Sequence, residues 1–277
     1  MTPRAVTLIV KPAPGGLPGF IETALRRPAE LVAVAGGEGT INAAAAALAG
    51  SGKTLMPIPA GTLDHLSRDL GIPADIDGAV AAMRHGRTAR VDVGQVDGHL
   101  FLGSSVIGLP SRIGGQREHR RGRLNPVRWI RVIARNLSTL CRDGRLDIRL
   151  PDGGVAPFRS RHLMVAVGGY DEAPGRLFTR SRLDTGAFEV YAMPRPTPSG
   201  LLLTCLRALA GRWRRSPELK TAKAVAVEVN SSRSKLRVMN DGELLLLEPP
   251  LSYSIRPAGL HVLRAAAAET DAHTAAA

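Results

Sequence analysis

The sequence predicts an α/β plus β protein, with an N-terminal Rossmann-like three-layer domain and a C-terminal, mainly β domain of the sandwich type. Three observations predict this fold class. Short apolar runs alternate with helix-like segments up to about residue 90, which is typical of parallel βα units. From residue 91 onward, strand-like segments separated by Gly, Pro and Asp predominate. The chain has 277 residues, which is enough for two modest domains.

The first ninety residues contain the βα alternation. We predict strands at residues 5–10, 31–35 and 55–58, and helices at 18–27, 40–49, 63–70 and 77–85. Continuous apolar strands between helices indicate a parallel sheet that is covered on both faces. Sheets of this kind bind their ligands at the carboxyl ends of the strands.

A glycine-rich turn, Gly-Gly-Glu-Gly-Thr at residues 36–40, follows the second predicted strand. Glycines let the backbone approach a ligand closely, and the helix behind them presents free N–H groups and the positive end of its dipole. Both properties suit a phosphate group. A second turn, Pro-Ala-Gly-Thr at residues 59–62, ends the next strand on the same rim. The two turns indicate a phosphorylated ligand, and an ordinary tight connection is the alternative.

The second domain is predicted to begin with a hairpin over residues 91–102 that turns at Asp97-Gly98. Further strands are expected at residues 146–150, 162–167, 187–191, 224–229, 236–239 and 244–247. One helix interrupts them, with Asn125 as its cap and Pro126 in its first turn. Arginines lie beside its apolar face, so it is either an interfacial helix or a surface helix with solvated arginines. Residues 266–277 are expected to form a disordered tail.

The positive charge is unevenly distributed along the chain. The net charge is +13, and eleven arginines stand against three acidic residues between Arg112 and Arg149. This predicts a basic face for the phosphates of membrane lipid or nucleic acid, with a solvated surface as the alternative. Aromatic residues make up 4% of the chain, and no nucleic-acid-binding motif is present, so we expect no nucleic-acid partner.

The cysteines and the apolar runs indicate where in the cell the protein is expected. Cys141 and Cys205 are the two cysteines, which argues against a disulfide framework or zinc site and favours a reducing cytoplasm. No stretch reaches the roughly 18 apolar residues of a membrane-spanning helix. We therefore expect a cytoplasmic protein that meets a membrane only at its surface.

Five motifs follow one another between residues 36 and 257. They are Gly-Gly-Glu-Gly-Thr at 36–40, Pro-Ala-Gly-Thr-Leu-Asp-His-Leu-Ser-Arg-Asp-Leu-Gly-Ile-Pro at 59–73, Val-Asp-Val-Gly at 91–94, Arg-Leu-Asp-Thr-Gly at 182–186, and Asn-Asp-Gly-Glu at 240–243 with Arg-Pro at 256–257 behind it. Their types and order resemble the diacylglycerol kinase-like lipid kinases, the bacterial branch of the enzymes that phosphorylate diacylglycerol, sphingosine and related lipids.

The resemblance implies a two-domain kinase that uses ATP and Mg²⁺. Residues 1–90 would bind the nucleotide, residues 91–257 the lipid, and residues 258–265 would return to the first domain. The nucleotide phosphates would be held by Gly36, Gly37, Gly39 and Thr40, assisted by Gly61 and Thr62. Mg²⁺ would be held by Glu38, Asp64, Asp92 and Asp184. Glu243 would be the general base and, with Glu38 and Asp92, would complete the catalytic set. Without the resemblance, Asp241-Gly242 would be an ordinary hairpin turn and Glu243 a surface residue.

Several positions depart from the family pattern. Glu38 stands for an aspartate, Asp64-His65 for Asn-Asp, and Thr185 for the second aspartate of an Asp-Asp-Gly turn. The nucleotide domain is also shortened by one βα unit. Two functions are therefore expected: an active lipid kinase at the anionic inner face of a membrane, or a catalytically degenerate relative that binds lipid or nucleotide. A homodimer and the identity of the lipid stay open. The motifs at residues 59–73 and 240–243 argue against NAD as the acceptor.

Overall fold

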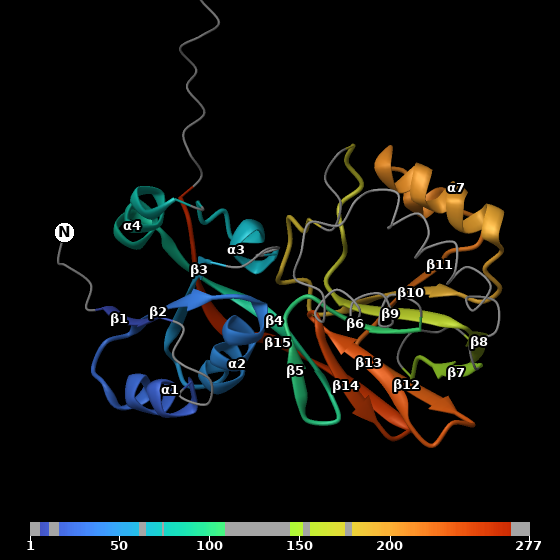
Figure 1. Ribbon diagram of the computed structural model, residues 1–277, viewed down its shortest axis with the longest axis horizontal. Helices are drawn as coiled ribbons and strands as arrows, with labels where there is room; N and C mark the ends of the chain where they lie inside the picture. Colours follow the sequence, from blue (N-terminus) through green and yellow to red (C-terminus); the bar gives the residue numbers. More distant parts are fainter. Residues whose placement is uncertain are drawn as a thin grey trace, which may run out of the picture. The chain divides into compact units, whose positions relative to one another are not determined.

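Figure 1 shows the computed structural model of the protein, which describes residues 6–10, 17–60, 65–73, 75–108, 145–151, 156–174 and 179–266. The chain divides into two compact units. The first contains Met1–Val91 and Gly259–Ala277, and the second contains Asp92–Ala258. The predicted α/β plus β fold class is confirmed, because helices and parallel strands make up the first unit while antiparallel strands dominate the second.

The first unit contains a parallel sheet of β1 (Val6–Val10), β2 (Leu31–Gly36) and β3 (Thr54–Pro59), in that order. The end of β15 (Leu251–Arg264) extends this sheet in parallel, because its residues His261 and Val262 pair with β3. Strand β2 is apolar and almost wholly buried, as expected for a strand with helices on both faces.

Four helices connect these strands: α1 (Leu17–Arg26), α2 (Glu38–Leu48), α3 (His65–Asp69) and α4 (Ile76–His85). Helix α2 buries Ile41, Ala44, Ala45 and Leu48, which recur with helical spacing on one face. Helix α4 begins where the Asp75 side chain accepts a hydrogen bond from the Gly78 N–H, a standard N-cap. The predicted helices are therefore present, and the described part of the third begins at His65.

The second unit contains two antiparallel arrays of strands. One is a six-stranded sheet in the order β11-β10-β9-β6-β13-β14, and the other includes β15-β12-β7-β8. These strands are β6 (Ser104–Ile107), β7 (Leu146–Arg149), β8 (Phe158–Ser160), β9 (His162–Val167), β10 (Phe188–Met193), β11 (Lys220–Ala224), β12 (Ala226–Ser231), β13 (Leu236–Asn240) and β14 (Glu243–Leu247). Strand β4 (Arg87–Val96) runs from the first unit into the second and forms a hairpin with β5 (His99–Phe101).

The core of the second unit lies between the two arrays. Buried side chains from both, such as Val165 and Val190 on one side and Val227 and Leu251 on the other, belong to a single cluster. Alternating buried and exposed residues along β7 and β13 place one face of each strand toward this core. The predicted sandwich character of the second domain follows from this packing.

The sequence reading missed one helix. It expected a single helix in the β domain, at residues 125–141, which lie outside the described part of the chain. The structure shows α7 (Pro198–Leu209), followed by the short 3₁₀ helix η1 (Trp213–Arg215). Residues 201–206 form a short, nearly continuous apolar run, and periodicity alone does not identify such a run as a helix.

Candidate functional site

The glycine turn at residues 36–40 joins β2 to α2 at the carboxyl end of the parallel sheet. Gly36 is the last residue of β2 and pairs with Pro59, the last residue of β3, so the two strand ends lie side by side. Gly37 is the N-cap of α2, and no side-chain hydrogen bond caps this end of the helix. Its carbonyl accepts hydrogen bonds from the backbone N–H groups of Thr40 and Ile41. The first turn of α2 is thus formed without a side-chain oxygen over its N–H groups.

The glycines of the turn differ in what surrounds them. A Cβ placed on Gly37 or Gly39 would meet no atom within 4 Å, whereas one placed on Gly36 would lie 2.7 Å from the Thr40 Cβ. Gly36 is therefore required for the packing of Thr40 against the strand end. Gly37 and Gly39 leave the backbone of the helix N-terminus open, which is the arrangement that binds anionic groups such as phosphate.

Glu38 and His65 lie together beside this turn. The Glu38 Oε1 and His65 Nε2 atoms are 3.8 Å apart, and both side chains are about one quarter to one third exposed. The pair is ionic when the imidazole is protonated. The structure thus brings the first residue of α3 to the first turn of α2, where the sequence placed candidate metal ligands. Gly61, Thr62 and Asp64 lie outside the described residues, between β3 and α3.

Asp92 is buried in the second unit and is fully engaged by backbone groups. Its exposed fraction is 3%. Its Oδ2 accepts a hydrogen bond from the Gly186 N–H at 2.6 Å, and its Oδ1 accepts one from the Ala258 N–H at 2.9 Å. Gly186 and Ala258 both have positive φ, at 67° and 51°. Asp92 therefore fixes two unusual backbone conformations, a role that the sequence reading did not consider.

The turn anchored by Asp92 carries the remaining acidic candidate. Asp184 is exposed, and its carboxylate lies 3.7 Å from the Arg182 Nε. The hydroxyl of the neighbouring Thr185 donates to the Ala187 carbonyl. The structure brings Asp92 close to the backbone of this turn, but it leaves the Asp184 side chain at the surface.

Glu243 is the first residue of β14, directly after the Asp241-Gly242 turn. Asp241 and Gly242 have φ values of 44° and 92°, as in a two-residue type I′ hairpin turn. Glu243 is exposed, and among the described residues nothing hydrogen bonds to its side chain. Its carboxylate is accessible from solvent.

The Asp241 carboxylate anchors this hairpin to the segment before β6. It accepts hydrogen bonds from the backbone N–H groups of Leu102, Gly103 and Ser104, at 2.6–2.8 Å. A Cβ on Gly103 would lie 2.6 Å from the Asp241 Oδ1, so glycine is needed there. Burial raises the pKa of Asp241, and the three backbone donors act in the opposite direction.

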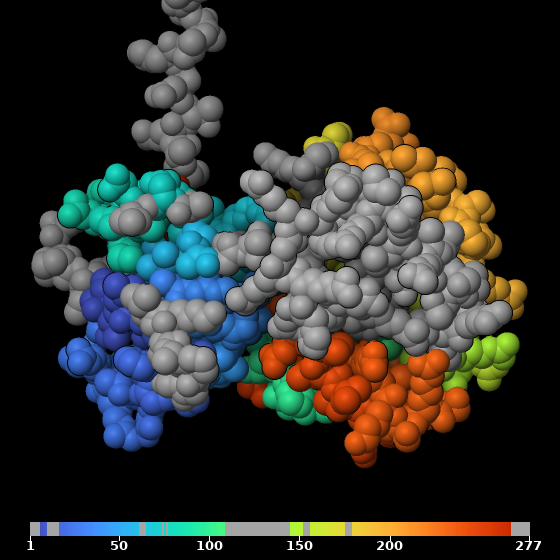
Figure 2. Space-filling model, in the orientation of Figure 1, coloured from blue at the N-terminus to red at the C-terminus, as the bar shows by residue number. Residues whose placement is uncertain are grey.

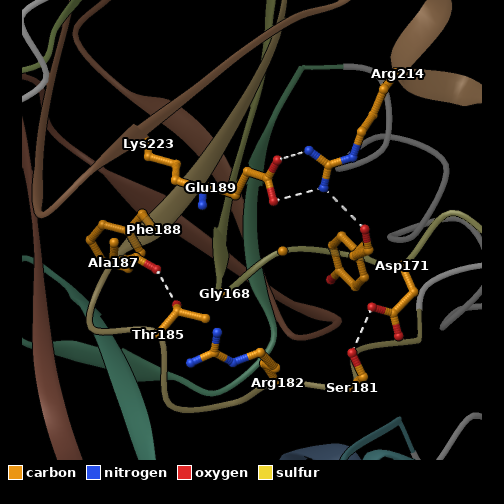
Figure 3. Close-up of a pocket in the computed structure, with 12 residues that line it drawn as sticks. Gly168, Asp171, Ser181, Arg182, Thr185, Ala187, Phe188, Glu189, Arg214 and Lys223 are labelled. Carbon is orange, nitrogen blue, oxygen red and sulfur yellow. Dashed lines mark hydrogen bonds and ion pairs between the residues drawn. The ribbon is translucent and has the colours of Figure 1, made fainter.

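A pocket of about 240 Å³ lies next to the Asp92-anchored turn (Figure 3). Gly168, Arg182, Thr185 and Lys223 line it, together with the ion pair of Glu189 and Arg214. Its volume is below the roughly 300 Å³ at which ligand pockets for drug-sized molecules begin. It is large enough for a small polar group and too small for a lipid chain.

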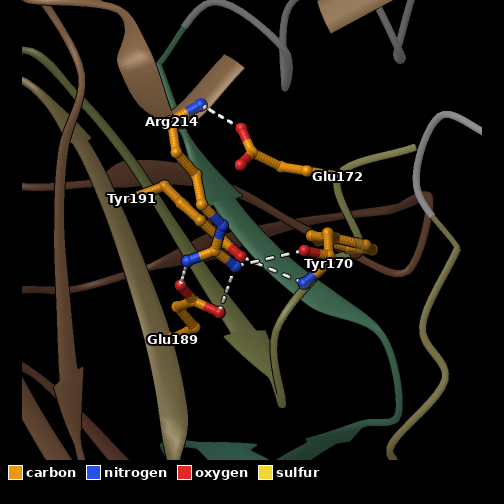
Figure 4. A network of polar contacts seen from close by, with 5 residues as sticks. All are labelled: Tyr170, Glu172, Glu189, Tyr191 and Arg214. Carbon is orange, nitrogen blue, oxygen red and sulfur yellow. Dashed lines mark hydrogen bonds and ion pairs between the residues drawn. The ribbon is translucent and has the colours of Figure 1, made fainter. Parts of the chain in front are cut away.

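The wall of this pocket is a network centred on Arg214 (Figure 4). The guanidinium forms a bidentate ion pair with Glu189 and donates a hydrogen bond to the Tyr170 carbonyl at 3.1 Å. The Tyr191 hydroxyl accepts from the Tyr170 N–H, and burial raises the pKa of this hydroxyl. The Arg214 guanidinium also lies 4.7 Å from the centre of the Trp213 ring. The Glu189 hydrogen bond raises the pKa of Arg214, which keeps the pair charged.

We expect Glu189→Gln to lower the free energy of unfolding by about 2 kcal/mol, because it leaves Arg214 without its charged partner. The Glu189 side chain is 6% exposed and that of Arg214 is 35% exposed, so the loss is smaller than for a fully buried pair. Urea unfolding measures it. Asp147→Asn is the matched control, since its ion pair with Arg159 is exposed and we expect a change below roughly 0.5 kcal/mol. Equal effects of the two variants would contradict the structural role of the network.

The acidic residues of the described chain do not form a preassembled metal site. Within the described ranges, no group of three or more His, Cys, Asp or Glu side chains lies close enough to hold a metal ion. Mg²⁺ does not need such a group beside a nucleotide, because one or two carboxylates and the phosphates complete its shell. The Glu38 carboxylate in the first turn of α2 fits that requirement. The Asp92 carboxylate accepts two backbone hydrogen bonds, and the Asp184 carboxylate lies near Arg182.

Two features of the site escaped the sequence reading. Asp241 was read only as a turn residue, and the Glu189–Arg214 pair was not identified. Gly169 lies against the Glu189 carboxylate, where a side chain would not fit, but the sequence does not show this contact. No local pattern links residues that are 25 positions apart in sequence, so tertiary structure was needed to find this pair.

Comparisons with known proteins agree with the motifs. The family model of the diacylglycerol kinase catalytic domain matches residues 5–96. A diacylglycerol kinase of Staphylococcus epidermidis (strain ATCC 35984) is 25% identical over 228 residues, covering 80% of this chain and 70% of that protein. One from Staphylococcus haemolyticus (strain JCSC1435) is also 25% identical, over 80% of this chain and 67% of its own length.

Solved structures support the fold. The crystal structure of a diacylglycerol kinase from Bacillus anthracis str. Sterne superposes with a TM-score of 0.65 at 19% identity, covering 95% of this chain and 98% of that one. A second structure from the same organism gives a TM-score of 0.70 at 19% identity and the same coverage. The predicted resemblance to the diacylglycerol kinase-like family is confirmed.

Proposed function

We propose that this chain is an ATP- and Mg²⁺-dependent lipid kinase that transfers the γ-phosphate of ATP to the hydroxyl of a diacylglycerol-like or sphingoid lipid. The observation that carries the proposal is the first turn of α2. It has no side-chain cap, Gly37 and Gly39 leave its backbone open, and Glu38 lies within it. A helix N-terminus with these properties suits nucleotide phosphates.

The chemistry assigns a separate task to each group. Gly36, Gly37, Gly39 and Thr40 hold the phosphates, with Gly61 and Thr62 from the neighbouring turn. Glu38 and Asp64 hold Mg²⁺, which neutralises charge on the transferred phosphoryl group when bound. The lipid oxygen forms a bond to the γ-phosphorus while the bond to the bridging oxygen breaks and ADP leaves. Glu243 accepts the proton that the lipid hydroxyl loses.

Asp92 has a positioning role in this proposal. Both of its carboxylate oxygens accept backbone hydrogen bonds, so it holds residues 183–186 and Ala258 in place rather than contacting substrate. Asp184 has no metal to bind in this scheme, because its exposed side chain lies near Arg182. The family pattern had suggested catalytic or metal-binding roles for both.

The proposal is tested by transfer of labelled γ-phosphate from ATP to diacylglycerol, monoacylglycerol, sphingosine, ceramide and phosphatidylglycerol. The lipids are presented in anionic micelles with Mg²⁺ or Mn²⁺. Diacylglycerol is the first candidate, because the matched relatives are named for it. A labelled lipid that depends on the divalent cation supports the kinase. No labelled product from a folded protein that binds ATP would overturn it.

Beside the departures from the family pattern, one contact in the structure bears on the degenerate alternative. His65 lies beside Glu38, at a motif position where the family has an acidic residue. In that case the protein would bind ATP or lipid vesicles and transfer no phosphate with any divalent cation. Nucleotide binding measured by calorimetry, beside the transfer assay, separates the two functions.

We expect Gly39→Ala to weaken ATP binding at least about tenfold while leaving the fold intact. The methyl group meets no protein atom but occupies the space beside the helix N-terminus where a phosphate would bind. Alanine also favours the helix by about 0.5 kcal/mol, so the melting temperature should not fall. Gly19→Ala is the matched control, because Gly19 lies in the first turn of α1 and its Cβ also meets nothing within 4 Å. Equal ATP affinity in both variants would place the nucleotide elsewhere.

A further inference from the structure

Helix α7 exposes an apolar face that no part of the described protein covers. None of its residues is buried. Leu202, Leu206 and Leu209 are 64%, 55% and 60% exposed, and Leu203 beside them is 42% exposed. The first three are spaced four and three residues apart, so they lie on one side of the helix. Figure 2 shows α7 (orange) at the surface of the second unit.

The polar groups of α7 are satisfied within its own neighbourhood. The Thr197 hydroxyl accepts a hydrogen bond from the Gly200 N–H and caps the helix, and the Thr204 hydroxyl donates to the Gly200 carbonyl. The Thr197 N–H donates to Glu218 at 3.0 Å. The helix is therefore held in shape while its leucines contact no core, so an apolar surrounding would be favourable for this face.

Basic residues lie close to this face in the sequence. From Arg195 to Lys223 the chain contains seven basic residues and a single acidic one, Glu218. Arg212 and Arg215, just after the helix, are exposed, and Arg207 in its last turn is half-buried. Arg214 is the one held in the ion pair with Glu189. A row of leucines beside arginines is the composition of a helix that lies in a membrane interface.

We propose that α7 docks the protein on the surface of an anionic phospholipid bilayer. The leucines enter the boundary between headgroups and acyl chains, and the arginines contact lipid phosphates. The inference deepens the proposed function, whose lipid substrate would be reached from a membrane. A second copy of the chain fits this face less well. An isologous dimer would bring the same arginine-rich patches together, and like charges at an interface are unfavourable.

The test is sedimentation of the full chain with vesicles of phosphatidylcholine containing 40% phosphatidylglycerol, without ATP or diacylglycerol. We expect wild-type protein to bind these vesicles and to bind pure phosphatidylcholine weakly. The triple variant Leu202→Ser, Leu206→Ser, Leu209→Ser should lose at least about tenfold in partitioning. Leu246→Ser is the matched control, because Leu246 on β14 is 61% exposed and should not affect binding.

A second set of variants tests the charge. Removing three positive charges with Arg207→Gln, Arg212→Gln and Arg215→Gln should weaken binding to the anionic vesicles and reduce its dependence on salt. Arg84→Gln with Arg87→Gln, exposed residues of the first unit, serves as the control and should bind nearly as wild type. Equal losses in both sets would point to net charge alone and would overturn the role of α7.

A fluorescence measurement on Cys205 tests the same docking surface without the serine variants, so their folding does not affect it. Cys205 is an exposed free thiol on α7 next to the leucine face, and a polarity-sensitive fluorophore can be attached to it in a Cys141→Ser background. We expect its emission to shift to the blue when anionic vesicles are added. No shift despite vesicle binding would place the docking surface elsewhere.

A dimer in ultracentrifugation that the triple serine variant dissociates would assign the face to a second copy instead. Phosphate transfer to lipid in detergent micelles tests the kinase separately, because that assay needs no bilayer.

Discussion

We expect Glu243→Gln to lower transfer of the γ-phosphate to lipid by roughly a hundredfold to ten-thousandfold, the usual contribution of a general base. Glutamine has almost the same size but cannot accept a proton. Glu243 is exposed, and its side chain has no hydrogen-bond partner among the described residues, so the free energy of unfolding should change by less than roughly 0.5 kcal/mol. Steady-state transfer from ATP and urea unfolding of the same preparations measure both quantities.

Glu228→Gln is the control for Glu243→Gln, because it removes one negative charge elsewhere on the surface. Glu228 is an exposed residue of β12, and we expect this variant to retain full activity. ATP affinity should be unchanged in Glu243→Gln, because the base acts on the lipid hydroxyl and not on the nucleotide. Full transfer activity in Glu243→Gln would remove the residue from the proposed mechanism.

The largest effect on stability is expected for Asp241→Ala, at about 3 kcal/mol or more. The substitution removes the acceptor of three backbone N–H groups, those of Leu102, Gly103 and Ser104. Each unsatisfied buried donor costs about 1–3 kcal/mol, and water entering the gap recovers part of that. Alanine is also a poorer residue than aspartate at a φ of 44°. Urea unfolding gives the loss directly.

The Asp97→Ala variant separates the contribution of the hydrogen bonds to the free energy of unfolding from the contribution of the turn conformation. Asp97 begins the same kind of Asp-Gly turn, with a φ of 45°, but its carboxylate accepts a single backbone hydrogen bond, from the Ser252 N–H at 3.0 Å. We expect a loss of about 1 kcal/mol for this variant. If Asp241→Ala and Asp97→Ala lower the free energy of unfolding equally, the Asp241 carboxylate has no special anchoring role.

Much of the fold was predictable because its signals are local. The apolar strand at residues 31–36 and the glycines after it identify a strand followed by a helix in which every neighbour is adjacent in sequence. The two Asp-Gly pairs at 97–98 and 241–242 predict hairpins for the same reason, since a type I′ turn needs positive φ at both positions. Helix α7 was missed because Leu201, Leu202 and Leu203 are consecutive, and the periodicity of a short apolar run does not distinguish a helix from a buried strand.

The sequence by itself predicted the α/β plus β fold class, the position of the glycine turn and the resemblance to the diacylglycerol kinase-like family. Only the tertiary structure decided which carboxylates are buried and which groups they contact. Asp92 and Glu189 are buried and held by distant partners, whereas Asp184 and Glu243 are exposed. The reason is physical: a strand or a turn depends on neighbouring residues, but burial and hydrogen bonding depend on residues up to 166 positions away in sequence.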